Sequence, residues 1–343
     1  MAWLESYFQT VWYGGRRPFV LLRPLEALYR RVVSKKRQTF LSNQSSIYKP
    51  RAPVLVVGNI TVGGTGKTPL TIHLIEALLE RGLRVGVISR GYGGKASKYP
   101  VLIDERSAAS EVGDEPLMIS QRTGVPVVVD PDRVSAAKFL ESANDLDIII
   151  SDDGLQHYKL WRSLEIVVMD VTRGIGNGRC LPCGPLREPL CRLESVDFLV
   201  INGANTSTLP SNIESQFRVH GAPLELPTLY PMNIRADDVV ALSGREQEVL
   251  ECQEVYGVAG IGNPSRFYTT LSEVGYQVIE RPFPDHHHFQ QSDFSLMQDK
   301  PVVMTEKDAV KVVSLGLVNG WYLRVSAQLE STLIDDIISK ISL

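Results

Sequence analysis

Residues 58–69 constrain the fold of this chain more than any other stretch, because they set glycines, a lysine and a threonine between two apolar runs. The run before them, residues 53–57, is apolar and largely β-branched, as in a buried strand. The run after them, residues 70–82, ends on a glycine and places five apolar residues on one helical face: Leu70, Leu74, Ile75, Leu78 and Leu79. A strand, a glycine-rich turn and a helix in this order predict a phosphate-binding loop.

The same stretch predicts which atoms would hold a nucleotide. Backbone N–H groups of such a loop surround phosphate oxygens, and the N-terminus of the helix adds partial positive charge. We expect Lys67 to reach the β- and γ-phosphates of ATP and the Thr68 hydroxyl to ligate Mg²⁺. The first glycine of the usual motif would fall on Thr61, so a purely structural glycine turn is the alternative. The residues expected to line the nucleotide are Thr61, Val62, Gly63, Gly64, Thr65, Gly66, Lys67 and Thr68.

A second signal follows the three isoleucines at 148–150, which predict a strand that ends at Asp152 and Asp153. A carboxylate at the end of such a strand holds Mg²⁺ in P-loop enzymes. A plain polar strand end or a helix cap is the alternative interpretation. Gln156 could face the site or cap the next turn, and the sequence leaves both open.

Charge is unevenly distributed along the chain. Residues 1–51 carry ten Lys and Arg against two Glu, although the net charge of the 343 residues is −3. A basic head on an acidic body suggests contact with an anionic surface, either a membrane or a nucleic acid. The four cysteines form no secreted disulfide framework, and the pair Cys180 and Cys183 lacks the partners of a zinc site, so a reducing cytosolic setting fits best.

The basic head also has helical periodicity. Residues 1–17 hold Trp3 and Trp12, and an apolar stripe follows with the arginines largely off it. Charged residues interrupt the stripe too often for a membrane span, and no cleavable signal is evident. Amphipathic, basic and aromatic helices are typical of a membrane interface, and the alternative is packing on the protein's own core. The stripe comprises Leu21, Leu22, Leu25, Leu28, Tyr29, Val32 and Val33.

From residue 51 onward the pattern alternates strands with helices or loops, which predicts an α/β fold of the P-loop NTPase type: a mostly parallel sheet with helices on both faces. We expect amphipathic helices at 1–50, a kinase domain at 51–203, a linker or hairpin at 204–234 and a smaller α/β domain at 235–343. The first domain's expected strands are 84–89, 126–130, 147–151, 164–170 and 196–202. Those of the second are 239–242, 255–259, 277–281, 301–305 and 321–325, with helices at 264–274, 306–315 and 329–339.

Two further stretches carry polar groups of uncertain role. Residues 181–189 contain three prolines and could hold Arg187 near phosphates or form a plain connector. Residues 286–288 are consecutive histidines, which point in different directions and make poor common metal ligands, but one or two could act in a cleft between the domains.

Taken together, these motifs resemble the tetraacyldisaccharide 4'-kinase family of lipid A biosynthesis. The matching stretches are residues 57–69, 89–93, 113–116, 151–157, 181–189, 283–287 and 305–311. The resemblance implies transfer of the ATP γ-phosphate to the 4'-hydroxyl of a tetraacyldisaccharide 1-phosphate, on the cytoplasmic face of the inner membrane of a Gram-negative cell. It implies that residues 1–37 bind the anionic membrane surface, and it suggests no nucleic acid and no obligate protein partner.

The resemblance also suggests site roles. Asp114 would be the catalytic carboxylate at the acceptor hydroxyl, with His286 or His287 as its partner from the second domain. Arg133, Arg187 and Gln156 would contact phosphate or substrate, and Thr68, Asp152 and Asp153 would hold Mg²⁺.

A competing interpretation is a membrane-associated switch ATPase related to partition and septum-positioning proteins. Those proteins share a similar loop and an amphipathic helix, but they carry a lysine early in the loop where this chain has Val62. A nucleic-acid ATPase is a weaker option, because no recognisable nucleic-acid-binding module is present.

Overall fold

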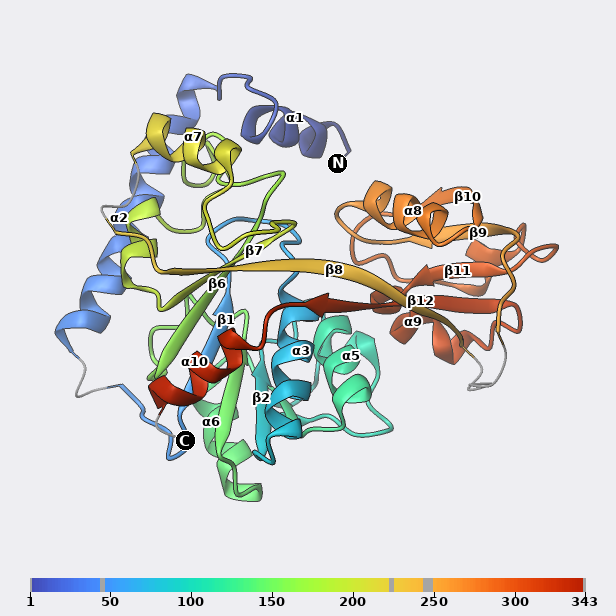
Figure 1. The fold of residues 1–343 in the computed structure, drawn as a ribbon, viewed down its shortest axis with the longest axis horizontal. Helices are drawn as coiled ribbons and strands as arrows, with labels where there is room; N and C mark the ends of the chain where they lie inside the picture. The colour runs from blue at the N-terminus through green and yellow to red at the C-terminus, as the bar shows by residue number, and fades with distance from the viewer. Residues whose placement is uncertain (1, 44–46, 222–224, 243–248, 342–343) are drawn as a thin grey trace.

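In the computed structural model one twisted sheet runs through two lobes (Figure 1). The structure describes residues 2–43, 47–221, 225–242 and 249–341, with side chains from residue 7 onward. Over these residues the strand order is β10-β9-β11-β12-β8-β7-β6-β1-β5-β2-β4-β3. Neighbouring strands are parallel except at β12–β8 and β3–β4, so the sheet is mostly parallel, as expected.

The strands of the larger lobe are β1 (Val54–Gly58), β2 (Val85–Ser89), β3 (Val101–Leu102), β4 (Val127–Val129), β5 (Ile148–Asp152), β6 (Leu164–Asp170) and β7 (Phe198–Asn202). Strand β8 (Thr228–Ala241) leads to the smaller lobe, which has β9 (Glu254–Ala259), β10 (Gln277–Pro282), β11 (Val302–Thr305) and β12 (Gly320–Gln328). The helices are α1 (Ala2–Trp12), α2 (Arg23–Ser42), α3 (Lys67–Glu80), α4 (Ala109–Val112), α5 (Asp114–Thr123), α6 (Arg133–Ala143), α7 (Ser211–His220), α8 (Pro264–Glu273), α9 (Glu306–Val312) and α10 (Thr332–Ile341). Short 3-10 turns occur at Val20–Leu22, Leu190–Ser195, Gln291–Phe294 and Val313–Leu315.

Helices cover both faces of the sheet in the larger lobe, which explains the uninterrupted apolar strands. In β1, Leu55 and Val57 pack into the core formed with α3, α5 and α10, while Val54 and Val56 pack into the core formed with α6 and α7. Because successive side chains of a strand point to opposite faces, both sets must be apolar. The sheet therefore holds the loops at its edge on a rigid base.

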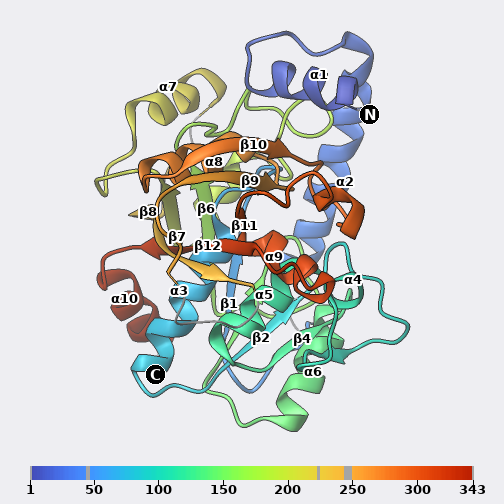
Figure 2. The same ribbon diagram turned by 90° about the vertical axis from the view of Figure 1, so that its right-hand side faces the viewer.

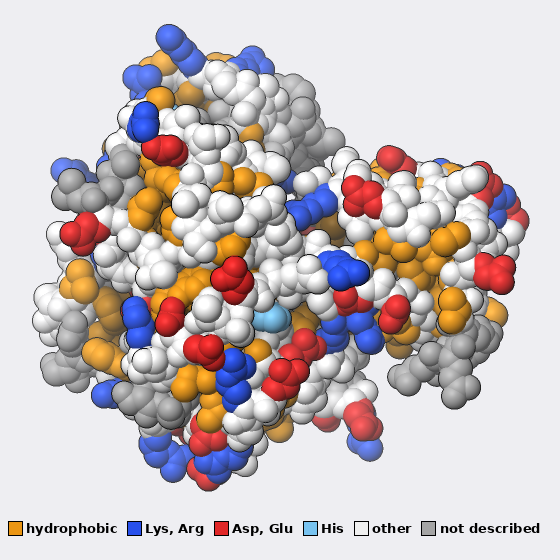
Figure 3. Space-filling view, in the orientation of Figure 1, with side chains coloured by type: hydrophobic (Ala, Val, Ile, Leu, Met, Phe, Trp, Pro, Cys, Tyr) orange, Lys and Arg blue, Asp and Glu red, His pale blue; other side chains and the backbone are white. Residues whose placement is uncertain are grey.

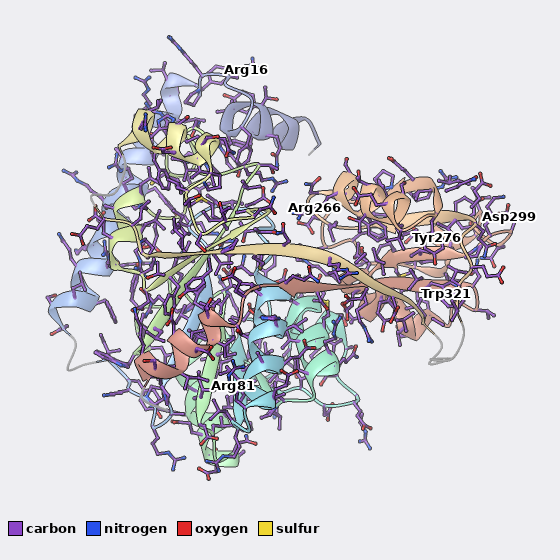
Figure 4. The ribbon with its side chains drawn as sticks, in the orientation of Figure 1. Arg16, Arg81, Arg266, Tyr276, Asp299 and Trp321 are labelled. Carbon is purple, nitrogen blue, oxygen red and sulfur yellow. The ribbon has the colours of Figure 1, made fainter. Side chains whose placement is uncertain are left out.

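The smaller lobe has the same layering. Helix α8 covers one face, in a core that includes Tyr276 and Trp321, and α9 covers the other face. Hydrophobic side chains gather on the visible face of this lobe in Figure 3, in the region where Figure 4 labels Tyr276 and Trp321. Figure 2 shows the lobe standing over α5.

Strand β8 and α7 correct the expectation of a hairpin in residues 204–234. Residues 211–220 form α7, because Ile213 and Phe217 are four positions apart and are buried on one helical face. Strand β8 then pairs in parallel with β7 and antiparallel with β12, so it is shared by both lobes. Residues 222–224, within the expected linker or hairpin, lie outside the described residues.

Part of the apolar stripe in the N-terminal basic segment contacts the rest of the protein, and part of it is exposed to solvent. On α2, the Tyr29 hydroxyl donates to the Arg187 carbonyl at 2.9 Å, whereas Leu21, just before the helix, is 83% exposed. Leu25, Leu28 and Val32 are also exposed. Packing on the protein's own core therefore accounts for only part of the stripe. No helix in the described ranges has the length and apolar character to cross a bilayer.

Candidate active site

Polar loops meet at one edge of the sheet, because β1, β2, β5, β6 and β7 are parallel and end there together. Such an edge is where ligands bind in open α/β sheets. The glycine-rich loop follows β1, and the two aspartates follow β5. The smaller lobe adds the loop that contains the histidines at 286–288 and the start of α9.

The glycine-rich loop has the backbone shape that phosphate binding requires. Gly63 and Gly66 have φ of 107° and 95°, in the left-handed region that glycine adopts without strain. From below, the Asn59 amide donates to the Gly63 carbonyl at 3.3 Å and the Asn202 amide donates to the Thr65 carbonyl at 3.1 Å. Lys67 is the first residue of α3. The loop therefore fits a phosphate chain at the positive end of a helix.

Asp152 and Asp153 occupy different environments. Asp152 is 2% exposed and accepts a hydrogen bond from the Ser89 hydroxyl at 3.3 Å. Burial raises the pKa of its carboxyl to about 7, and the charges of Glu115 and Asp153 act in the same direction. Burial would also raise the pKa of Asp153, but Lys67 at 3.7 Å and Arg187 at 3.0 Å hold it below its ordinary value.

These two carboxylates fit Mg²⁺ only with help from other ligands. In the described part of the chain no three His, Cys, Asp or Glu side chains cluster in a way that could hold a metal ion. Mg²⁺ typically binds one or two carboxylates together with water and substrate phosphates. A buried Asp152 of raised pKa, close enough to Lys67 at the start of α3 to be affected by its charge, suits that ligand set together with Thr68, the next residue of α3, because a bound cation would favour the charged form of Asp152.

The other residues expected to contact substrate are engaged within the protein. Arg133 is 1% exposed and donates to the backbone carbonyls of Asp130 and Asp152, at 3.0 and 3.1 Å. Gln156 donates to the Asn59 carbonyl and to Glu188. Arg187 forms a two-oxygen ion pair with Asp153. Arg133 and Gln156 thus support the loops, and Arg187 is the one of the three that pairs with a predicted metal ligand.

Asp114 and His286 come from different lobes and meet. Asp114 starts α5, and its Oδ2 lies 3.0 Å from His286 Nδ1, while Lys307 Nζ of α9 lies 3.9 Å from the same oxygen. Asp114 is 5% exposed, so its carboxylate is largely shielded from water, whereas the His286 side chain is 29% exposed. His287 instead faces Asp293 at 3.0 Å. The structure therefore brings His286, and not His287, to the candidate catalytic carboxylate.

The pair is arranged to keep both charges. Burial alone would raise the pKa of Asp114, but the hydrogen bond to His286 and the charge of Lys307 hold it below its ordinary value. The same hydrogen bond raises the pKa of His286, against the opposing effects of burial and Lys307. An ionised Asp114 at neutral pH can accept a proton.

Backbone strain marks the same region. The non-glycine residues of positive φ in the described ranges are Asp153 at 45° and His286 at 58°. Such conformations cost about 1–3 kcal/mol each and cluster at functional sites. Both lie among the residues that the sequence singled out.

Sequence reasoning missed Lys307 and Glu115. Lys307 Nζ lies 3.0 Å from Glu115 Oε1, and Glu115 in turn raises the pKa of Asp152. Among the charges that affect the pKa of the buried Asp152, Glu115 in the first turn of α5 therefore raises it, and Lys67 at the start of α3 lowers it. The available signal was that both residues lie in stretches that match the family, at 113–116 and 305–311. Within the second stretch, Thr305 caps the helix by accepting from Asp308 N, and the neighbouring Lys307 makes the contact with Glu115.

Arg266 was also missed. It starts from α8 and reaches across between the lobes (Figure 4), where its guanidinium lies 3.3 Å from Asp170 Oδ2 and 3.5 Å from Asn202 Oδ1. It therefore joins the smaller lobe to the ends of β6 and β7. No motif in the sequence indicated it.

Comparisons with known proteins identify the family to which the chain is similar. A family model described as tetraacyldisaccharide-1-P 4'-kinase matches residues 18–342. A protein of Pseudomonas fluorescens (strain SBW25) named tetraacyldisaccharide 4'-kinase is 49% identical over 316 residues, or 92% of this chain and 90% of that protein. A protein of the same name from Pseudomonas aeruginosa (strain PAO1) is 47% identical over 322 residues, or 93% and 92%. The crystal structure of LpxK from Aquifex aeolicus in complex with ATP matches with a TM-score of 0.75 at 27% identity, covering 93% of this chain and 98% of that one.

Proposed function

This chain belongs to the tetraacyldisaccharide 4'-kinase family, and on that premise we propose how its own residues transfer the ATP γ-phosphate to the 4'-hydroxyl of tetraacyldisaccharide 1-phosphate. The match covers nearly the whole chain, so it favours the kinase over the switch ATPase. The assignment of individual residues is the proposal.

On the acceptor side, Asp114 is the general base. As the bond from the 4'-oxygen to the γ-phosphorus forms and the bond from phosphorus to the bridging oxygen of ADP breaks, the hydroxyl proton passes to the Asp114 carboxylate. The transition state of phosphoryl transfer is loose, so the base mainly has to be positioned and charged. His286 orients Asp114 by its 3.0 Å hydrogen bond, and Lys307 adds positive charge.

On the donor side, Lys67 and the backbone N–H groups of residues 63–68 hold the phosphate chain, whereas the Val62 N–H already donates to the Pro185 carbonyl. When bound, Mg²⁺ would neutralise developing charge on the phosphates, held by Thr68 with Asp152 and Asp153. Arg187 positions Asp153 by its ion pair. Arg133 positions the end of β5 from beneath, through the Asp152 carbonyl.

The exposed part of the apolar stripe supports peripheral binding to the membrane surface. Leu21, Leu25 and Leu28 of the stripe are each more than half exposed, as are Phe19 and Val20 just before it, and basic residues flank them. Amphipathic, basic helices with this pattern lie in the plane of the bilayer interface. We assign this face to the cytoplasmic side of the inner membrane, where a lipid acceptor and ATP can both reach the enzyme. The side chain of Trp3 lies outside the described residues.

The observation that carries the proposal is the Asp114–His286 pair, formed across the lobes, with the adjacent Glu115 close enough to raise the pKa of Asp152. The test is an assay of the full chain with radiolabelled ATP, with and without tetraacyldisaccharide 1-phosphate. Label should appear in the glycolipid only when the acceptor is present. ATP turnover that is equally fast without the acceptor would instead favour the switch ATPase.

A further inference from the structure

The N-terminal helix α1 lies outside the part of the chain that the family model matches, yet it is docked on the loop that follows β6. Val11 is 1% exposed, and its carbonyl accepts from the Asn177 amide at 3.1 Å. The Trp12 indole N–H donates to the Pro182 carbonyl at 3.2 Å. The end of α1 is thus held by specific contacts, in addition to any contact with lipid.

The same end of α1 reaches the glycine-rich loop. The Tyr13 hydroxyl lies 3.4 Å from the Val62 carbonyl, to which it donates, and Val62 N donates to the Pro185 carbonyl at 2.9 Å. Burial raises the pKa of Tyr13, so its phenol stays protonated at neutral pH. Tyr13 and residues 182–185 therefore hold the first half of the loop from one side.

Tyr13 also holds a cation. The Arg173 guanidinium carbon lies 5.7 Å from the centre of the Tyr13 ring, within the range of a cation–π contact. A Cβ built on Gly63 would lie 2.7 Å from Arg173 Nη1, so this nitrogen lies directly over the glycine. Among the described residues no carboxylate forms an ion pair with the Arg173 side chain, which contrasts with the paired Arg187 and Arg266.

We propose that Arg173 is a second phosphate-binding cation of the nucleotide loop, and that Tyr13 of the N-terminal segment is the positioning residue that holds it over Gly63. Arg173 is half-buried, and in the described part of the chain its charge is balanced only by the Tyr13 ring. A phosphate bound to the loop would form charge-assisted hydrogen bonds with it, and such bonds are strong. The N-terminal segment thus contributes to nucleotide binding as well as to membrane binding. This inference rests on the nucleotide site proposed above.

The test is calorimetric titration of the full chain, in detergent micelles, with ATP and Mg²⁺ and without acceptor. Arg173→Gln should raise the Kd for ATP about 10-fold, as expected for loss of a charged hydrogen bond. Arg173→Lys should recover part of that loss. Tyr13→Leu should weaken ATP binding nearly as much as Arg173→Gln, and Tyr13→Phe, which keeps the ring, should weaken it less.

Three controls separate the possible causes. Arg218→Gln removes an arginine whose side chain is 76% exposed on α7, and it should leave the Kd unchanged. Binding of Arg173→Gln to anionic vesicles should equal that of the wild type, which separates phosphate binding from membrane binding. Without ATP, the Tm of Arg173→Gln should match the wild type; if it does not, Arg173→Lys and Tyr13→Phe decide the question.

The outcomes are distinct. If Arg173→Gln and Arg218→Gln bind ATP equally well while Lys67→Ala does not, the inference is wrong and the proposed nucleotide site stands. If Lys67→Ala also binds ATP normally, the nucleotide site itself is misplaced. If Tyr13→Leu binds ATP as the wild type does, Tyr13 does not position Arg173.

Discussion

Asp114 Oδ2 and His286 Nδ1 lie 3.0 Å apart although 172 residues separate them in the chain. Asp114 starts a helix of the larger lobe, and His286 lies on a loop of the smaller lobe in a left-handed backbone conformation. The contact therefore depends on how the lobes are placed against each other. This pair gives the first two predictions.

Asp114→Asn should lower kcat about 10²–10⁴-fold, the range for loss of a general base. The amide cannot accept the proton of the acceptor hydroxyl, but it keeps the size of the side chain. The Kd for ATP should stay within about twofold of the wild-type value, because the partners of the Asp114 carboxylate in the described part of the chain are Glu115 N, His286 and Lys307, none of them in the nucleotide loop. Parallel measurements of kcat and of ATP binding check this, and an equal loss in both would assign Asp114 a structural role.

His286→Gln should destabilise the protein in a pH-dependent way. The pKa of His286 is raised in the folded state, so its contribution is full below the ordinary value of about 6.5 and is lost as pH rises through the raised pKa. The pKa of Asp114 is lowered, so on the acid side the contribution is present above about 3.9 and is lost as pH falls through the lowered pKa. The Tm difference from wild type should be largest between about pH 4 and 6.5 and should shrink by pH 9.

The matched control is His220→Gln on the exposed end of α7, which should show no such pH trend.

The pH dependence of kcat/KM on the acid side, its acid limb, gives a second measurement on His286→Gln. Without the hydrogen bond from His286, the pKa of Asp114 should rise and that limb should move to higher pH. A limb that stays in place would argue against Asp114 as the base.

Lys67→Ala should lower kcat/KM for ATP about 10²–10³-fold, because a preorganised cation on the phosphates is removed. Lys67 is also a partner of Asp153 at 3.7 Å, so the effect should exceed that of a surface charge. Steady-state kinetics with ATP varied at fixed acceptor measure it. Lys340→Ala, whose side chain is half exposed on α10, is the control and should behave as wild type.

Replacing Leu21, Leu25 and Leu28 together by Ser should lower partition onto anionic vesicles at least about 100-fold, since burying each leucine contributes about 1.5–3 kcal/mol. These side chains are exposed and make little contact with the rest of the protein, so ATP binding should not change. Vesicle sedimentation measures the partition. Leu296→Ser, at a leucine 86% exposed on the smaller lobe, should leave it unchanged; an equal loss there would mean that the stripe is not the membrane face.

Point variants test membrane binding better than removal of residues 1–36. Val11, Trp12 and Tyr13 contact the loop at 177–185 and the nucleotide loop. Deleting them would disturb the nucleotide site and the membrane face together. The substitutions on the exposed stripe leave those contacts in place.

Features that depend on neighbours in the chain were predictable from the sequence. The strand, glycine turn and helix around Lys67, and the isoleucines that lead to Asp152, follow from local periodicity and turn chemistry. The error in residues 204–234 has a local cause as well. A short helix and a strand that serves two lobes leave weaker patterns than a buried parallel strand, so the sequence suggested a linker or hairpin there.

The sequence by itself determined the α/β fold, the phosphate loop and the residue types of the site, because these depend on the spacing of apolar and polar residues along a few turns of chain. Only the tertiary structure decided which histidine meets Asp114, that Lys307 and Glu115 join them, and that Tyr13 and Arg173 lie against Gly63. His286 and His287 are adjacent, so composition cannot separate them. The left-handed backbone at His286 and the docking of the lobes turn one ring toward Asp114 and leave the other with Asp293.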